Sequence, residues 1–283
     1  MNHKDKKGYG LLPLPKDDRD FSFGGTFTLP KLSELPDEYE VETVRFMKDQ
    51  NGTDMCSAYA LSAVSEDQED VALSPFYTFA KIKEIMGGDL SEWGADLRSA
   101  CKAATTYGFL EVRGVLPVPT SNDRDDIVNR DWSIEDRNFA GKKHAKKSYF
   151  NVDGHYDMFD NMRATMWKMQ EEDRSIFTGI TWRPSWDLKP GGVIKDYDKN
   201  ESGYGHAIKI FGWKIINGET FLMAQLSNGT LIGDGGIFYL SREIINTKCT
   251  FGAYTFADLP REDVEYKLGR IGFFNYWLKF LFQ

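Results

Sequence analysis

Apolar positions recur at helical spacing in three stretches of the first half of the chain. The run CSAYALSAVSE, which starts at Cys56, is rich in small apolar residues and predicts a buried helix. In LSPFYTFAKIKEIM, Ser74 is placed to cap a helix and Pro75 to occupy its first turn, with apolar residues recurring behind them. The stretch GADLRSACKAATTYGF predicts a third helix that ends at Gly108.

The apolar pattern changes in the second half of the chain. One more helix is expected over residues 161–172, and after it come SIFTGITW, HAIKIFGWKII, ETFLMAQLS and GGIFYLS, separated by Gly and Asn turns. Runs of β-branched and aromatic residues between such turns are typical of strands. Helices followed by strands, without βαβ alternation, indicate an α+β fold.

The two ends of the chain differ from its body. Residues 1–37 interleave proline and glycine with charged residues, so we expect an extended N-terminal arm that lies on the body. Residues 266–283 form a hydrophobic tail, and a helix there would carry an apolar face. That face could dock on its own core, on a protein partner or second copy, or shallowly on a membrane, and the pattern leaves all three open. The face consists of Phe273, Phe274, Trp277, Leu278 and Leu281.

Length and charge narrow the class of protein. The 283 residues suit one large domain or two lobes, and a hydrophobic fraction of 41% is enough for a substantial core. The net charge of −8 argues against nucleic acid as a partner, because phosphate binding needs a cationic face. The basic run GKKHAKK, residues 141–147, is expected to be a solvated loop or helix end. No apolar run reaches the roughly 20 residues that span a bilayer, so no transmembrane segment is expected.

The number of cysteines indicates whether the protein is made in a reducing or an oxidising compartment. Cys56, Cys101 and Cys249 are few and odd in number, and the first twenty residues are polar and charged, without a visible secretory signal. We therefore expect a reducing compartment, the cytoplasm, or a virion if the protein is viral. Cys101 lies among alanines in the third helix and is expected to be a core thiol.

Metal and cofactor motifs are not evident. The four histidines form no HExxH or paired Cys/His pattern, and GxSxG and the phosphate-binding GxxxxGK[ST] are absent. The stretch DYDKNESGYG begins like a calcium loop, but Glu201 stands where a glycine is required and Ala207 where the terminal glutamate belongs, so a polar turn is expected. We expect no metal and no cofactor.

The stretch DQNGTDMCSAYALS holds the candidate nucleophile. Cys56 opens a predicted helix six residues after Gln50, which is compatible with a nucleophile or with an ordinary buried thiol. His206 follows Gly203-Tyr204-Gly205 at the start of a predicted strand, where it could reach a cleft or be a half-buried structural histidine.

Five motifs in order resemble the papain-like cysteine peptidases of the C1 family: MKDQNGTDMCSAYA, LSPFYTFAKI, GADLRSACKAATTYGF, GYGHAIKIFGW and SNGTLIGDGGIFYLS. The opening residues are similar to the shorter microbial and viral members, which carry an N-terminal arm. The resemblance implies a papain-like domain over residues 38–265, with a helical lobe over about 38–150 and a β-rich, barrel-like lobe over about 150–265. The active-site cleft would lie between the two lobes.

The resemblance implies a catalytic set. Cys56 would be the thiolate nucleophile at a helix N-terminus, and His206 its ion-pair partner and proton donor to the leaving amine. Gln50 and the backbone N–H of Cys56 would form the oxyanion hole. Gly94 and Ala95 would pair with the substrate backbone, and Gly179 and Ala207 would line a side-chain pocket, although ordinary packing glycines fit the same pattern.

The sequence departs from the family at three places. Where the family has the asparagine and tryptophan of NSWG, this chain has Leu226 and Asn228. Positions two apart on a strand share a face, so Asn228 is predicted to orient His206 from its shifted place. Ser57 replaces the tryptophan after the cysteine, and Asp54 replaces a glycine before it and would oppose thiolate formation.

These residues lead to a peptidase of peptide or protein substrates as the expected function. The alternative is a weak or inactive papain-like module that binds peptides or serves as a structural subunit, for example of a virion. The arm is expected to regulate access to the cleft, since arms held by few contacts open easily.

Overall fold

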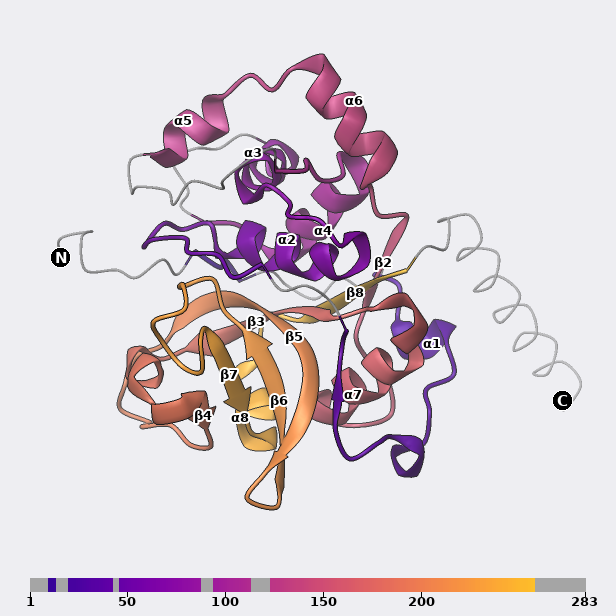
Figure 1. Cartoon of the computed structure of the whole chain (residues 1–283), viewed down its shortest axis with the longest axis vertical. Coiled ribbons are helices and arrows are strands. Elements are labelled where there is room, and N and C mark those ends of the chain that lie inside the picture. Colours follow the sequence, from indigo (N-terminus) through magenta and orange to yellow (C-terminus); the bar gives the residue numbers. More distant parts are fainter. Residues whose placement is uncertain (1–9, 14–19, 43–45, 88–93, 113–122, 258–283) are drawn as a thin grey trace, which may run out of the picture.

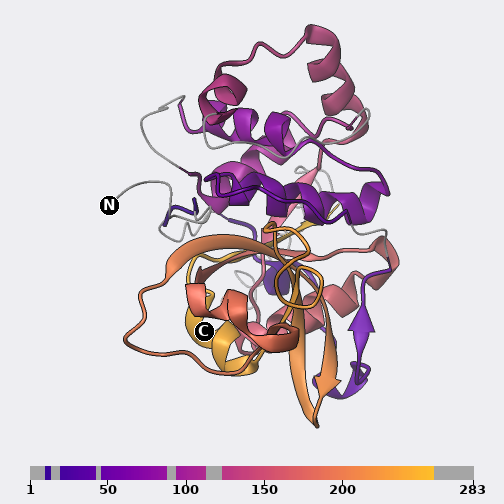
Figure 2. The same cartoon turned by 60° about the vertical axis from the view of Figure 1, so that its left-hand side comes forward.

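The chain folds into a helical lobe and a β-rich lobe, seen one above the other in Figures 1 and 2. This computed structural model describes residues 10–13, 20–42, 46–87, 94–112 and 123–257. The architecture is α+β, as predicted from the order of the elements. The hydrophobic tail predicted over 266–283 lies outside the described residues.

The helical lobe contains the three helices that the apolar spacing predicts, with two more above them in Figure 1. The predicted cap is present, since the Tyr77 backbone N–H donates to the Ser74 hydroxyl and Pro75 begins its helix. Asp96 caps the next helix by accepting from the Ser99 N–H. The helices are α2 (Cys56–Glu69), α3 (Pro75–Ile85), α4 (Leu97–Thr106), α5 (Asp123–Asn129) and α6 (Ile134–Lys143).

The β-rich lobe is built on an eight-stranded, mostly antiparallel sheet in the order β2-β8-β3-β5-β6-β7-β4, with β1 paired to β5. The expected barrel-like closure is wrong, because β2 and β4 form the two ends of the described sheet and do not pair. The strands are β1 (Tyr39–Glu40), β2 (Ser148–Asn151), β3 (Ile176–Trp182), β4 (Val193–Ile194), β5 (Tyr204–Ile216), β6 (Glu219–Gln225), β7 (Ile237–Leu240) and β8 (Ala253–Ala257).

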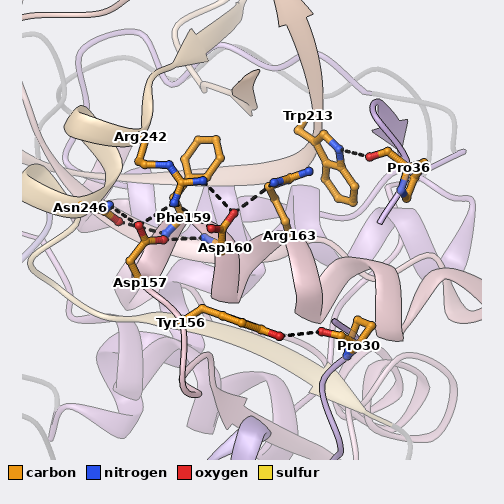
Figure 3. Close-up of polar contacts among 10 residues, drawn as sticks. All are labelled: Pro30, Pro36, Tyr156, Asp157, Phe159, Asp160, Arg163, Trp213, Arg242 and Asn246. Atoms are coloured by element: carbon orange, nitrogen blue, oxygen red, sulfur yellow. Dashed lines mark hydrogen bonds and ion pairs between the residues drawn. The ribbon is translucent and has the colours of Figure 1, made fainter. Parts of the chain in front are cut away.

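Two helices pack together against the sheet, α7 (Met158–Lys168) and α8 (Arg242–Lys248). The helix expected over 161–172 begins three residues earlier, where Asp157 caps it by accepting from the Asp160 N–H. A separate 3₁₀ turn, η3 (Gln170–Glu172), follows it. Arg242 of α8 donates to Asp157 at 2.6 Å and to Asp160 at 2.8 and 3.0 Å, which ties the two helices together (Figure 3).

The later part of the arm is anchored on the β-rich lobe. It contains two short turns of helix, α1 (Phe23–Thr26) and η2 (Leu32–Glu34). Figure 3 shows two of the anchors: the Trp213 indole donates to the Pro36 carbonyl at 3.1 Å, and the Tyr156 hydroxyl donates to the Pro30 carbonyl at 3.1 Å. Asp20 pairs with Arg98 of the helical lobe at 2.8 Å. This part therefore binds both lobes.

The two lobes meet where α2 crosses β5. Apolar residues of both lobes share one core here, including Leu61 from the helical side and Phe177 from the sheet. Two buried ion pairs hold α2 in place. Lys209 of β5 pairs with Asp67 of α2, and Lys48, which precedes α2 in the chain, pairs with Glu66 of α2. Because Cys56 begins α2 and His206 lies on β5, this contact sets their relative position.

The basic run at residues 141–147 is only partly solvated, which corrects the prediction. Lys142 and Lys143 end α6 at the surface, but His144 and Lys146 are buried. His144 Nδ1 lies 2.7 Å from a Glu69 carboxylate oxygen, and Lys146 donates to the same carboxylate at 2.6 Å. The run thus anchors the end of α2 through charge pairing. Cys101 is fully buried on α4 among alanines, as expected of a core thiol.

No helix in the part of the chain that the structure describes is long and apolar enough to cross a membrane.

Candidate active site

Cys56 is the first residue of α2, and its side chain is fully buried between the lobes. Its sulfur accepts hydrogen bonds from the backbone N–H groups of Ala207, Gly10 and Ser57. Ala207 directly follows His206 on β5, so the candidate nucleophile lies at the strand that carries the candidate base.

His206 is also fully buried, on the strand pair β3–β5, where it lies opposite Ile180. The Asn228 side chain acts on the imidazole ring and favours its protonated form. A backbone bridge to Asp49 holds Asn228 beside the loop that leads into Cys56. Leu226, at the position where the family has its asparagine, is instead buried in the apolar core of the β-rich lobe.

Gln50 is fixed by hydrogen bonds on both ends of its side-chain amide. Its Nε2 donates to the Thr53 carbonyl at 2.6 Å, and its Oε1 accepts from the Ser227 hydroxyl at 2.5 Å. The Gln50 backbone N–H donates to the Ser227 carbonyl at 2.8 Å. An amide nitrogen has two hydrogens, and the bond to Thr53 uses one of them.

Two residues near the site were not assigned a role from the sequence. Ser227 orients the Gln50 amide, and the only sequence signal was its place in LSNG between the two departing positions. The Trp182 ring lies 6.2 Å from the His206 ring, and its own indole N–H donates to Asp187 at 2.9 Å. Trp182 ends the predicted strand SIFTGITW, but only the strand register places it near His206.

A segment of the arm, Gly10–Leu12, lies in the site and pairs with both lobes. The Leu11 N–H donates to the Gly205 carbonyl at 3.2 Å on the β-rich side. On the helical side, the Ala95 N–H donates to the Gly10 carbonyl at 2.8 Å, and the Leu12 N–H donates to the Ala95 carbonyl at 3.1 Å. Ala95 therefore pairs with an extended peptide backbone, whereas the backbone N–H and carbonyl of Gly94 bond to the Asp54 and Lys83 side chains.

The Leu11 side chain is buried in an apolar site between the lobes. Gly179 lies opposite Ala207 on β3 and β5, and both residues contribute to this region. A Cβ on Gly179 would come within 2.3 Å of Leu11 Cδ2 and 2.7 Å of Phe251 Cβ, so glycine is needed to leave room for Leu11. Leu97 and Phe251, which the sequence did not single out, contact the same space.

Burial keeps both candidate catalytic groups neutral in this structure. It raises the pKa of the Cys56 thiol to about 11, and the nearby charge of Asp54 adds to the effect, while the backbone N–H donors act in the opposite direction. Burial also lowers the pKa of His206 to about 4, although the interaction with Asn228 opposes this. The thiol and the imidazole are thus uncharged near neutral pH while the arm covers them.

These pKa values predict how stability depends on pH. Between about pH 6.5 and pH 4 the unfolded chain protonates His206 and the folded chain does not, so stability falls as pH falls, by up to about 1.4 kcal/mol per pH unit. Between pH 9 and about 11 the unfolded chain ionises Cys56 first, so stability falls as pH rises. Urea unfolding at a series of pH values measures both slopes.

Two variants serve as controls for this pH dependence. His206→Gln should make the acid slope shallower by about one proton, and Cys56→Ala should do the same for the alkaline slope. If the free energy of unfolding of both variants depends on pH in the same way as that of the parent, neither His206 nor Cys56 has the shifted pKa.

Among the residues that the structure describes, no cluster of three His, Cys, Asp or Glu side chains is arranged to hold a metal ion.

The fold is that of the papain-like cysteine proteases. No protein-family model matches the chain, and no curated protein matches it in sequence. In structure it is similar to xylellain, a cysteine protease from Xylella fastidiosa, with a TM-score of 0.74 and 20% identity over 92% of this chain and 99% of that one. It is also similar to procathepsin B S9 from Trypanosoma congolense, with a TM-score of 0.64 and 16% identity over 91% of this chain and 88% of that one.

A further similar structure is the digestive procathepsin L 3 of Tenebrio molitor larval midgut, with a TM-score of 0.63 and 14% identity over 91% of this chain and 79% of that one. At these identities the comparisons establish the two-lobe papain-like fold that the motifs predicted. The activity has to be argued from the site itself.

Proposed function

We propose that the protein is a cysteine peptidase with Cys56 as nucleophile and His206 as general base and acid. The observation that supports this proposal is the position of Gly10–Leu12 between the two lobes. An extended backbone passes between the lobes, pairs with Ala95 and Gly205, and places its Gly10 N–H on the Cys56 sulfur. A peptide substrate that replaced this segment would bring a peptide bond to the same sulfur.

The reaction follows from the groups around that bond. The Cys56 sulfur attacks the carbonyl carbon as its proton passes to His206, and the oxyanion receives hydrogen bonds from the Cys56 backbone N–H and from Gln50 Nε2. His206 then protonates the leaving amine as the C–N bond breaks and a thioester remains. Water, deprotonated by His206, hydrolyses the thioester and restores the thiol. Asn228 keeps the imidazole oriented throughout.

The arm is proposed to be an internal inhibitor. The Gly10 carbonyl accepts from the Ala95 N–H, so it is turned toward Ala95 rather than toward Gln50. A carbonyl outside the oxyanion hole gains no stabilisation when it is attacked. The arm thus occupies the cleft with its Gly10 carbonyl directed to Ala95, and burial raises the pKa of the Cys56 thiol.

Removing the oxyanion donor tests the assignment of Gln50. Gln50→Ala should lower kcat by about 100- to 1000-fold, while alkylation of Cys56 by iodoacetamide, which forms no oxyanion, continues at a similar rate. Ser227→Ala is the companion variant, because it removes the hydrogen bond to Gln50 Oε1 and leaves the Gln50 side chain in place. A smaller loss of kcat is expected for it. Equal losses of alkylation and cleavage in Gln50→Ala would assign the residue to the fold instead.

The alternative function is a papain-like module that binds a peptide without cleaving it. It is favoured by the burial of Leu226 in the core at the position where the family has its orienting asparagine. A thiol-reactive peptide epoxide separates the two functions, since labelling of Cys56 needs an activated thiol and binding alone does not. We further propose a reducing compartment, where Cys56, Cys101 and Cys249 would stay free as they are here.

A further inference from the structure

The backbone N–H and carbonyl of Gly94 are each held by a buried charged side chain, and the two side chains are of opposite charge. Its N–H donates to an Asp54 carboxylate oxygen at 2.6 Å. Its carbonyl accepts from the Lys83 ammonium at 3.1 Å. Asp54 is only 6% exposed and Lys83 1%. Buried charges are costly unless they form strong hydrogen bonds, so this arrangement calls for a reason.

Asp54 belongs to the loop that leads into Cys56, whereas Lys83 lies on α3. The two side chains thus connect the nucleophile loop and a neighbouring helix to one residue, Gly94. Two residues further along the chain, Asp96 caps α4. Gly94 has a positive φ of 90°, and a Cβ on it would lie 1.9 Å from the Gly10 carbonyl oxygen. The backbone is therefore fixed at a close approach that only glycine permits.

The sequence suggested only a disadvantage for Asp54, namely a negative charge near the thiol. The electrostatic effect of Asp54 does raise the pKa of Cys56, although burial is the larger cause. A residue that opposes ionisation of the nucleophile and is nevertheless buried beside it fits a second, positioning role.

We propose that Asp54 and Lys83 are positioning residues that fix the Gly94–Ala95 edge at the correct distance from Cys56, so that an extended substrate binds in register with the nucleophile. The inference rests on the proposed peptidase function. Hydrogen bonds to charged groups are stronger and shorter than neutral ones, which suits them to holding a backbone edge in place. If the Gly94–Ala95 edge becomes more mobile, both the substrate and the arm bind less tightly, because both pair with Ala95.

Because the arm uses the same edge, the test compares two reagents on the full chain. Iodoacetamide alkylates Cys56 without pairing with the protein backbone. An epoxide on a leucine-containing peptide reaches Cys56 only when its peptide backbone pairs with the Gly94–Ala95 edge. Both reagents require the arm to leave, so the ratio of their rates isolates the effect of the edge. Asp54→Ala and Lys83→Met should each lower the epoxide-to-iodoacetamide ratio by about ten- to a hundredfold.

Asp54→Asn separates position from charge, because its side-chain oxygen still accepts from the Gly94 N–H. It should keep the parent ratio, whereas the pH midpoint of alkylation should move down in both Asp54→Asn and Asp54→Ala. Glu84→Ala, next to Lys83 on α3 and half exposed, is the matched control and should leave the ratio unchanged. A parent-like ratio in Asp54→Ala would overturn the proposal and leave charge as the only effect.

A second measurement does not depend on activity. Amide hydrogen exchange of the Gly94–Ala95 segment should be faster in Asp54→Ala than in the parent, Asp54→Asn or Glu84→Ala. Equal exchange in all four proteins also overturns the positioning role. If the parent is labelled by neither reagent, the proposed peptidase function fails, and the exchange data still decide whether Asp54 holds the edge.

Discussion

Cys56→Ala should abolish peptide cleavage while leaving the fold intact. Loss of the nucleophile of a catalytic pair costs on the order of 10⁶-fold in kcat, because no other group can form the acyl intermediate. Labelling by a thiol-reactive peptide epoxide should disappear in the same variant. Both are measured with a short fluorogenic peptide and by mass spectrometry, with thermal unfolding as the check on folding.

Cys101→Ala is the matched control for this experiment. Its thiol is also fully buried, and burial raises its pKa well above the ordinary value, but it lies inside α4 rather than at the start of a helix beside His206. This variant should retain cleavage and labelling. If Cys56→Ala cleaves as well as the parent, or if the label is found on Cys101, Cys56 is not the nucleophile.

Removal of the arm should raise the rate of cleavage of a small peptide. Deleting residues 1–20 would remove an anchor, because Asp20 pairs with Arg98 at 2.8 Å and accepts from the Tyr254 hydroxyl at 3.2 Å. A deletion that ends at Pro13 keeps this anchor and removes Gly10–Leu12 from the cleft. The exposed thiol should then have a lower pKa, because burial is the main cause of its rise.

A single substitution makes the same test in the full chain. Leu11→Asp places a carboxylate in the apolar site next to Gly179 and Phe251. Burial of a leucine contributes about 1.5–3 kcal/mol, so its loss should open the cleft about ten- to a hundredfold more often. The rates of cleavage and of iodoacetamide alkylation should rise together.

Leu32→Asp is the control within the arm, since Leu32 is 37% exposed on η2. It should change neither rate. If cleavage by the shortened chain and by Leu11→Asp equals that of the parent while thermal unfolding shows an intact fold, the arm is structural and does not regulate access.

The sequence alone determined features that depend on neighbouring residues. The cap at Ser74 and the apolar spacing behind it placed α3 closely, because a cap is a contact within one turn of helix. The strands β3, β5, β6 and β7 were recognisable as apolar runs between turn residues. The spacing of Gln50 and Cys56 was also readable, because one short loop and the first turn of α2 contain both residues.

Tertiary structure alone decided the features that join distant segments. His144 and Lys146 looked like a solvated basic run, and only the approach of Glu69 explains their burial. The position of Gly10–Leu12 in the cleft depends on Ala95 and Gly205, and the role of Asp54 depends on Gly94, forty residues away. Such contacts leave no periodic signal, because the energy of a buried charge or a backbone pair is set by the partner that folding brings to it.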